Sequence, residues 1–391
     1  MELSKYVVKF DSDGKIYYFN TKNNISCSID KKLIQKMQED SDIYNQYCDF
    51  LKQFKFYPES DDVEGYIEQL KARDAENLSI TILAHGDCNF RCKYCYEEFE
   101  NMNISNNEDA ILNFIANKVN EGQYKSLNIG WFGGEPLLGY KEIMELSVRM
   151  LNFAEERNIR YSANITTNGY LLSKDVFLNL VENAKVKLFQ VTIDGDQRGH
   201  DSQRVLRNGA GSYLKILNNL KEISLTDSDF QIIVRMNVSK DNLESIKIFL
   251  DKDGLFMRKD PRYSLIFRNV GDWGQGERNS DYCVPLIEND ISYDLSVEAI
   301  TKGYRIADAA IYSNNFFSCY AQKHNSYGID VHGNIIKCTV DLYNKKNIIG
   351  NILTNNNQML NNEDYWIKSY AFSKKCINCN LFVTVQDPLT E

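Results

Sequence analysis

The chain has 391 residues, of which 43% are hydrophobic, and its formal charge at pH 7 is −9. This length predicts two or three domains with a large core, and the acidic balance argues against nucleic acid as a partner. The sequence has no 18-residue apolar run and no signal peptide, so we expect a cytoplasmic protein without a membrane partner.

Residues 1–75 predict a small α+β domain. Tyr6–Phe10 and Ile16–Phe19 flank a turn that contains Gly14, which is typical of a hairpin. Helical patterns follow over Ser28–Glu39 and Ile43–Phe54. Either this domain recognises another molecule or it is a plain cap on the next domain.

From residue 78 to about residue 300, strand and helix patterns alternate. Such a rhythm predicts parallel strands with right-handed crossovers. Six units favour an α/β fold with a partial (β/α)6 TIM barrel over residues 76–300, and function is expected at the carboxyl ends of its strands. The predicted strands are Leu78–Leu83, Leu127–Phe132, Arg160–Thr166, Val186–Ile193, Phe230–Val238 and Arg262–Phe267, and helices are expected at about 106–121, 141–157, 173–183, 212–223 and 241–252.

The first strand runs into three cysteines at C-x3-C-x2-C spacing, Cys88, Cys92 and Cys95, followed by Tyr96. One short loop with this spacing can give one thiolate to each of three irons. A 4Fe–4S cluster normally takes four cysteines, so one iron would stay open to a substrate or cofactor. The alternative is a zinc knuckle, but zinc sites use paired C-x2-C units and complete four ligands.

This motif resembles the signature of the radical SAM enzymes, C-x3-C-x2-C followed by an aromatic residue, here Tyr96. The resemblance implies that the open iron binds the amino and carboxylate groups of S-adenosylmethionine. One electron from the cluster would then cleave this cofactor to a 5′-deoxyadenosyl radical. An electron donor such as flavodoxin or ferredoxin is the implied partner.

The second strand ends in Gly133, Gly134, Glu135 and Pro136. Two glycines let the backbone approach a ligand closely, and a carboxylate suits a cationic group. The segment resembles the family's GGE motif, which implies contact with the methionyl amine of S-adenosylmethionine.

Polar residues end the next strands. Alternation puts Asn164, Thr166 and Asn168 on one face, and Thr192 and Asp194 on another. The resemblance implies that these residues contact the cofactor's carboxylate and ribose. Arg235, on the fifth strand, lies among apolar neighbours and needs an anion partner, for which the cofactor's carboxylate is a candidate. Capping of the next turn, and for Arg235 a structural ion pair, are the alternatives.

A stretch from Arg198 to Arg204 contains His200 and Asp201 and resembles the DG…HD…R segment of radical SAM peptide-modifying enzymes. For His200 we expect a local hydrogen bond rather than acid–base chemistry. A later loop that contains Trp273 could line a substrate channel, or it could be an exposed loop without a functional role.

The last 75 residues carry Cys319, then a G-x4-C unit of Gly333 and Cys338, then Cys376 and Cys379. Tyr327–Val331 and Asn334–Lys337 predict a hairpin. The pattern resembles the SPASM and twitch extensions of radical SAM enzymes, which implies a domain over residues 301–391 with an auxiliary 4Fe–4S cluster. A structural zinc site on the same four cysteines is the alternative.

The tail departs from a full SPASM domain, because Val385 and Leu389 stand where cysteines are due. Either one auxiliary cluster binds, as in twitch domains, or a SPASM domain has lost ligands. The four cysteines complete the ligand set of one cluster, which favours a single auxiliary cluster. Cys27, Cys48 and Cys283 fit no ligand spacing and are expected to be ordinary thiols.

The leading hypothesis is a radical SAM oxidoreductase that matures a ribosomally made precursor peptide. Residues 1–75 are similar in length and order to the peptide-recognition elements of such maturases, so the leader of a leader-plus-core peptide would add to the hairpin edge. Hydrogen abstraction would lead to a thioether, a carbon–carbon crosslink or an epimer. No residue identifies itself as a general base.

Three alternatives stay open. Sulfatase-maturing enzymes place an Asp directly after the G-x4-C cysteine, whereas this chain has Thr339, with Asp341 two residues further on. A small-molecule twitch dehydrogenase would need no peptide-recognition unit. A homologue that binds peptide without catalysis would form clusters but no deoxyadenosine.

Overall fold

The chain forms two compact units in this computed structural model. The structure describes residues 7–12, 14–20, 25–53, 56–57, 72, 74–271, 291–307, 319–354 and 362–367. The first unit comprises Met1–Lys71, Asp308–Ser318 and Ala371–Thr384, and the second comprises Ala72–Ala307, Cys319–Tyr370 and Val385–Glu391. Among the residues just given, no helix has the length and apolarity that a membrane crossing needs.

The first unit begins with a three-stranded antiparallel sheet, β1 (Val7–Ser12), β2 (Lys15–Asn20) and β3 (Ile25–Asp30), in that order. Helices α1 (Lys31–Glu39) and α2 (Ser41–Gln53) follow. The predicted hairpin is present, but the helix expected from Ser28 begins at Lys31. Ser28 pairs with Tyr17 of β2, and Asp30 instead caps α1 by accepting a hydrogen bond from the Lys32 amide at 2.8 Å.

A small apolar cluster holds this unit together. Its buried members come from β2, β3, both helices and the segment after α2: Ile16, Tyr18, Ile29, Met37, Leu51 and Phe56. The Tyr18 hydroxyl also accepts a hydrogen bond from the Tyr47 hydroxyl at 2.8 Å. Among the described strands, β1 and β3 each have a single neighbour, so each presents an edge.

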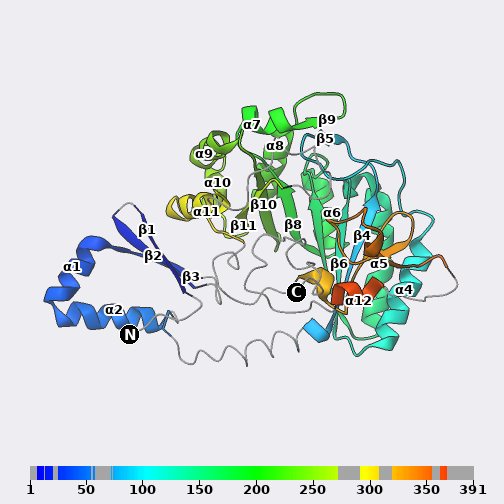
Figure 1. The fold of residues 1–391 in the computed structure, drawn as a ribbon, viewed down its shortest axis with the longest axis horizontal. Helices are drawn as coiled ribbons and strands as arrows, with labels where there is room; N and C mark the ends of the chain where they lie inside the picture. The colour runs from blue at the N-terminus through cyan, green and yellow to red at the C-terminus, as the bar shows by residue number, and fades with distance from the viewer. Residues whose placement is uncertain are drawn as a thin grey trace, which may run out of the picture. The chain divides into compact units, whose positions relative to one another are not determined.

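The second unit is built on a nine-stranded sheet in the order β11-β10-β8-β7-β6-β4-β12-β13-β14. Figure 1 shows β11, β10 and β8 side by side in this sheet. Six of its strands are the parallel strands of the predicted partial barrel, and each starts and ends within two residues of the prediction. They are β4 (Asn77–His85), β6 (Ser126–Gly133), β7 (Arg160–Thr167), β8 (Val186–Thr192), β10 (Gln231–Val238) and β11 (Tyr263–Asn269).

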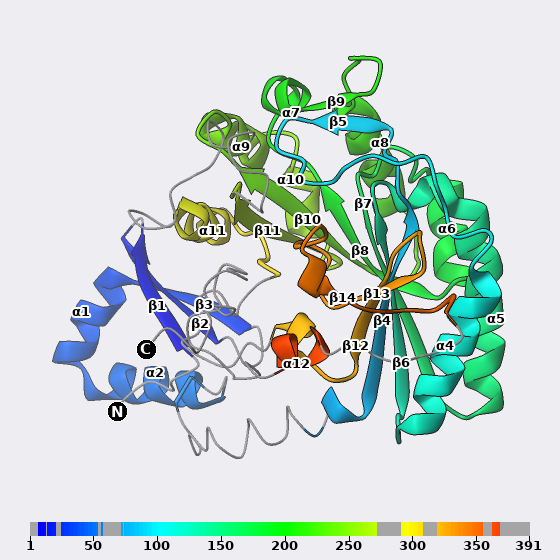
Figure 2. The same cartoon turned by 45° about the vertical axis from the view of Figure 1, so that its right-hand side comes forward.

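Helices connect these strands where the sequence predicts them. They are α4 (Glu108–Glu121), α5 (Tyr140–Glu156), α6 (Lys174–Glu182), α8 (Tyr213–Ser224) and α9 (Leu243–Asp251), with the shorter η1 (Pro136–Gly139), α7 (Gln197–Gln203), α10 (Leu255–Lys259) and the later α11 (Ile291–Thr301). Figure 2 shows α4, α5 and α6 along the outer side of the strands.

Burial alternates along the strands in a way that separates the two faces of the sheet. In β7, Ala163 and Ile165 are buried, while Asn164 and Thr166 are only half-buried. The buried residues pack toward the helices, so the polar residues between them face the barrel interior. The sheet thus directs polar groups to the place where a parallel barrel carries its site.

The C-terminal segment extends the same sheet. Strand β12 (Ser326–Ile329) pairs in parallel with β4, and β13 (Asn334–Ile336) and β14 (Ile348–Asn351) follow antiparallel. The predicted hairpin around Gly333 is therefore present, with φ +76° at that glycine. Its attachment to β4 was not predicted. The elements η4 (Tyr320–Gln322), η5 (Lys345–Asn347) and α12 (Asn362–Ile367) complete this segment.

Candidate active site

The cluster loop, residues 86–102, leaves the carboxyl end of β4 and returns to its own starting point. The Gly86 amide donates to the Met102 carbonyl at 2.8 Å, and the Glu100 amide donates to the Gly86 carbonyl at 3.1 Å. A Cβ at Gly86 would lie 2.8 Å from the Glu100 carbonyl oxygen. The closed neck therefore needs glycine and makes the loop a preformed unit.

Asp87 organises the start of the loop. One carboxylate oxygen accepts from the Cys88 amide at 2.8 Å and from Arg91 at 3.1 Å, and the other accepts from Arg207 at 2.9 Å. Burial raises the pKa of Asp87, but these donors outweigh it and the net pKa is lowered. The carboxylate stays charged and fixes the backbone at the first cysteine.

A second clamp comes from the Arg198–Arg204 stretch. The short strand β5 (Phe90–Cys92) pairs antiparallel with β9 (Arg204–Leu206) (Figure 2), so that Cys92 lies opposite Arg204.

As expected, His200 makes local hydrogen bonds. Its Nδ1 accepts from the Asp194 amide at 3.2 Å, and burial lowers its pKa, which keeps the ring neutral.

The cluster loop brings its three thiols close enough to interact electrostatically, and burial raises the pKa of each, that of Cys95 to about 12. A bound metal would favour the thiolate forms. Within the described part of the chain, no three ligating groups converge on a point where one metal ion would sit. In a cubic iron–sulfur cluster each of the three thiolates would bind a different iron.

The two glycines at the end of β6, Gly133 and Gly134, place the next segment against the cluster loop. The Gly134 amide donates to the His85 carbonyl, and the Glu135 amide donates to the Asp87 carbonyl, both at 3.0 Å. A Cβ at either Gly133 or Gly134 would lie 2.5 Å from a carbonyl oxygen of residues 85–87. The glycines are therefore required by the close approach of two backbones, and they bring Glu135 beside Cys88.

Glu135 is a fully buried carboxylate. It accepts hydrogen bonds from the Thr167 hydroxyl at 2.6 Å, the Asn168 amide at 2.7 Å and the Leu137 amide at 3.0 Å, just after Pro136 starts η1. Burial raises its pKa. Among the described salt bridges none involves Glu135, so the ammonium of a bound amino acid moiety would supply a cation that suits it.

The residues at the end of β7 lie at different depths. Asn168 donates to Asn89 at 2.7 Å and lies 3.7 Å from the Cys88 sulfur. Asn164 instead donates to Asn128 at 3.1 Å, deeper in the sheet, and Thr166 faces the interior between them. The structure thus brings Asn168 to the cluster loop and leaves Asn164 and Thr166 along the barrel wall.

Asp194, a predicted cofactor contact, anchors the cluster loop from behind. It is fully buried and accepts hydrogen bonds from the Tyr94 hydroxyl and, at 2.7 Å, from the Asn237 amide. Arg204 donates to the same Tyr94 hydroxyl at 2.7 Å. Sequence reasoning missed Tyr94, although a tyrosine inside the motif was a visible signal.

Two arginines of this region, Arg204 and Arg235, could bind the carboxylate of a ligand. The buried Nε of Arg204 has no hydrogen-bond partner among the described residues. Arg235 lies opposite Thr192 in the register and donates to Asn237 at 2.8 Å. Burial lowers the pKa of Arg235, and the nearby Arg268 lowers it further. An anion at this place would offset that repulsion.

The C-terminal segment reaches the cluster loop through Tyr96. The Tyr96 hydroxyl donates to the Thr339 carbonyl at 3.0 Å, directly after the buried Cys338. The Cys338 sulfur accepts from the Val340 amide at 3.2 Å and the Asp341 amide at 3.3 Å. Cys319 is buried as well. Other predicted positions, Trp273, Cys376, Cys379, Val385 and Leu389, lie outside the described residues.

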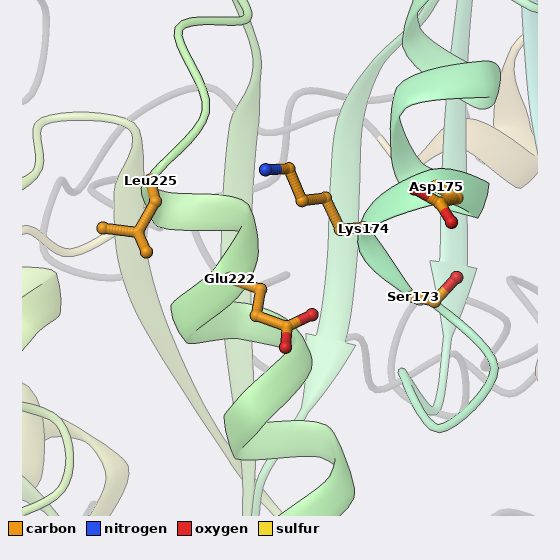
Figure 3. A pocket seen from close by; sticks show the side chains of 5 residues that line it. All are labelled: Ser173, Lys174, Asp175, Glu222 and Leu225. Atoms are coloured by element: carbon orange, nitrogen blue, oxygen red, sulfur yellow. The ribbon is translucent and has the colours of Figure 1, made fainter.

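A further pocket of about 400 Å³ is lined by none of these groups. It lies between the start of α6 and the end of α8, and its lining side chains are Ser173, Lys174, Asp175, Glu222 and Leu225 (Figure 3). None of the predicted site residues contributes to this pocket, so it is separate from the candidate active site.

Comparisons with known proteins agree with this geometry. Residues 82–251 match the model of the Radical SAM superfamily. This chain contains a radical SAM domain, whose cofactors are a 4Fe–4S cluster and S-adenosylmethionine, and the expectation of a radical SAM enzyme is confirmed.

Two relatives illustrate the range of similar proteins. The chain is 22% identical to the radical SAM cyclopropyl synthase TigE of Paramaledivibacter caminithermalis, over 97% of this chain and 87% of that protein. It is 28% identical to a cysteine-type anaerobic sulfatase-maturating enzyme of Clostridium novyi, over 48% of this chain and 51% of that protein. The second match thus spans about half of each chain.

Solved structures show the same fold at low identity. Native anSMEcpe with bound AdoMet and Cp18Cys peptide superposes with a TM-score of 0.57 at 20% identity, over 75% of this chain and 82% of that one. Streptococcus suis SuiB bound to precursor peptide SuiA gives 0.51 at 13% identity, over 93% and 88%. These likenesses confirm the partial barrel.

Proposed function

We propose that this protein is a radical SAM enzyme that modifies a ribosomally made peptide. The observation that carries the proposal is the contact between Tyr96 and Thr339, because it sets Cys338 beside the cluster loop. Cys319, Cys338, Cys376 and Cys379 would hold an auxiliary 4Fe–4S cluster there, next to the place where the cofactor is cleaved.

Residues of the barrel would bind and position S-adenosylmethionine. Glu135 would hold the amine of S-adenosylmethionine, and Tyr96, Gly133, Gly134, Thr192 and Arg235 would line its place. When bound, the cluster and S-adenosylmethionine would supply radical chemistry for abstracting a hydrogen atom from the substrate, and the barrel residues around them would exclude water.

The first unit would bind the leader of the precursor peptide. Its sheet presents strand edges at β1 and β3, and backbone groups on such an edge can pair with an extended peptide. Two proteins that resemble this chain support a peptide substrate, since SuiB is seen with its precursor peptide and anSMEcpe with a peptide.

The proposal is tested with cluster-loaded protein, S-adenosylmethionine and dithionite under anaerobic conditions, with peptides encoded beside its gene. We expect 5′-deoxyadenosine and a mass change in one peptide. Deoxyadenosine without any peptide change would count against a peptide substrate, and no deoxyadenosine would support a non-catalytic homologue.

Sulfatase maturation is the second candidate, because several similar proteins carry that activity. Thr339 argues against it, since its hydroxyl lies 2.7 Å from the Tyr320 hydroxyl and offers no carboxylate base. Incubation with a cysteine-containing sulfatase peptide separates the two: formylglycine in that peptide would favour the second candidate.

A further inference from the structure

Lys337 is a buried lysine directly before Cys338 in the chain. It is only 1% exposed, whereas lysines are almost never fully buried unless they are paired. The ammonium nitrogen donates hydrogen bonds to the Lys323 carbonyl at 2.6 Å and to the Ser326 carbonyl at 2.8 Å. It also lies 4.8 Å from the centre of the Tyr327 ring. These contacts suit a charged ammonium, but none of them supplies an anion.

Three ionisable groups act on the charge of Lys337. Burial lowers the pKa of Lys337 to about 8, which leaves the ammonium as the main form at pH 7. Glu363 and Cys319 raise this pKa, whereas Lys118 lowers it. Glu363 and Lys118 carry opposite charges and oppose each other, and among the described salt bridges none involves Lys337. A thiolate at Cys319 is therefore the group whose charge would complement the buried ammonium.

The hydrogen bonds of Lys337 also join the segments that carry two of the predicted ligands. Cys319 lies directly before η4, and Lys323 lies directly after it. The bond from Lys337 to the Lys323 carbonyl thus ties the Cys319 segment to the end of β13, where Cys338 follows. The two thiols interact electrostatically, and the Cys338 sulfur accepts two backbone amides. Two buried sulfurs with such donors fit thiolate ligands of an iron–sulfur cluster.

We propose that Lys337 is a positioning residue of the auxiliary cluster, and that its buried positive charge favours the reduced form of that cluster. Each thiolate ligand brings one negative charge, and reduction by one electron adds another. A fixed positive charge beside the ligands therefore stabilises the reduced form more than the oxidised form. The inference rests on the proposed function, because it requires the proposed auxiliary cluster.

Three substitutions separate the charge of Lys337 from its hydrogen bonds. Lys337→Arg keeps the positive charge, Lys337→Gln keeps an N–H donor without charge, and Lys337→Met keeps a similar length with neither. Lys118→Gln is the matched control, because Lys118 also lies over the Tyr327 ring, at 5.4 Å, but binds Glu121 at 2.9 Å. The full-length protein is loaded with iron and sulfide. A redox titration followed by electron paramagnetic resonance gives the reduction potential of each cluster, and iron analysis counts the clusters.

We expect Lys337→Gln and Lys337→Met to lower the equilibrium constant for reduction of the auxiliary cluster by about tenfold, which equals about 59 mV for a one-electron couple. Lys337→Arg should leave this constant nearly unchanged because it keeps the charge, and Lys118→Gln should change it less than Lys337→Gln does. The first cluster is the internal reference. Its signal should change when S-adenosylmethionine is added, and its potential should be the same in all variants.

The outcomes separate this inference from the proposed function. Equal potentials in Lys337→Gln and Lys337→Arg, with about eight irons per chain in both, would overturn the role of the charge. If the uncharged variants hold only about four irons, about eight in Lys337→Arg would support that role, whereas about four in all three would overturn it in favour of the hydrogen bonds alone. About four irons in the wild-type protein would instead overturn the auxiliary cluster of the proposed function, and this inference with it.

Discussion

The cluster loop and the segment around Cys338 hold their cysteine thiols in different ways. In both, a buried sulfur accepts backbone amides, from Phe90 at 3.4 Å for Cys88 and from Val340 at 3.2 Å for Cys338. The first site has three thiols within one short loop, whereas the predicted second set runs from Cys319 to Cys379. Sequence spacing alone brings the three cysteines of the cluster loop together. The cysteines of the second group lie far apart in the sequence, and their approach to the cluster loop depends on the pairing of β12 with β4.

The largest effect should come from the cysteines of the cluster loop. Replacing Cys88, Cys92 and Cys95 with Ala should abolish cleavage of S-adenosylmethionine and remove about four irons per chain, because one whole cluster is lost. Iron analysis and deoxyadenosine assays measure this. Cys27→Ala is the matched control outside any ligand spacing and should change neither; deoxyadenosine formation by the triple variant would refute the assignment.

The second group of cysteines should behave differently. Cys338→Ala should lower the iron content from about eight to about four per chain and stop peptide modification, while the first cluster remains. Deoxyadenosine should still form with dithionite. Iron analysis and peptide mass spectrometry check this, and an unchanged iron content would mean that Cys338 holds no cluster.

Glu135 lies beside the cluster loop and is the proposed contact for the amine of S-adenosylmethionine. In Glu135→Gln the side chain loses its charge and keeps one acceptor oxygen for three donors, so a donor is left unsatisfied. We expect about 1–3 kcal/mol lower unfolding free energy and roughly tenfold weaker binding of S-adenosylmethionine. Denaturant unfolding and equilibrium binding measure both, with the exposed Glu145→Gln as control; equal affinity would contradict the role.

The smallest effect should come from the contact that joins the two regions. Tyr96→Phe removes the hydrogen bond to Thr339 and should cost about 0.5–1.5 kcal/mol of unfolding free energy. Tyr170→Phe is the control, because its ring packs on Phe90 and its hydroxyl makes no hydrogen bond to any described residue. Equal stability of the two variants would show that the contact contributes nothing.

Most of the barrel could be predicted because its strands and helices follow local hydrophobic periodicity. The error in the first unit has a local cause as well. Residues 25–30 carry a helix-capping signal at Ser28, but pairing with β2 extends the strand to Asp30. Tertiary pairing outweighed a weak propensity.

The structure places some of the predicted site residues beside the cluster loop, through hydrogen bonds that the sequence does not predict. Asn168 and Glu135 lie beside the cluster loop, as their strand-end positions suggest. Asp194 holds Tyr94 instead of standing open toward the interior, because its carboxylate is fully buried behind the loop. Whether it also contacts the cofactor stays a prediction.

The cluster loop, the succession of parallel strands and the glycines beside the loop could be predicted from the sequence, because each depends on spacing within a few residues or on one repeating period. The pairing of β9 with β5 and the addition of β12 to the barrel sheet beside β4 emerge only from the folded chain. These pairings join segments more than a hundred residues apart, and no local pattern encodes which edge a strand will meet.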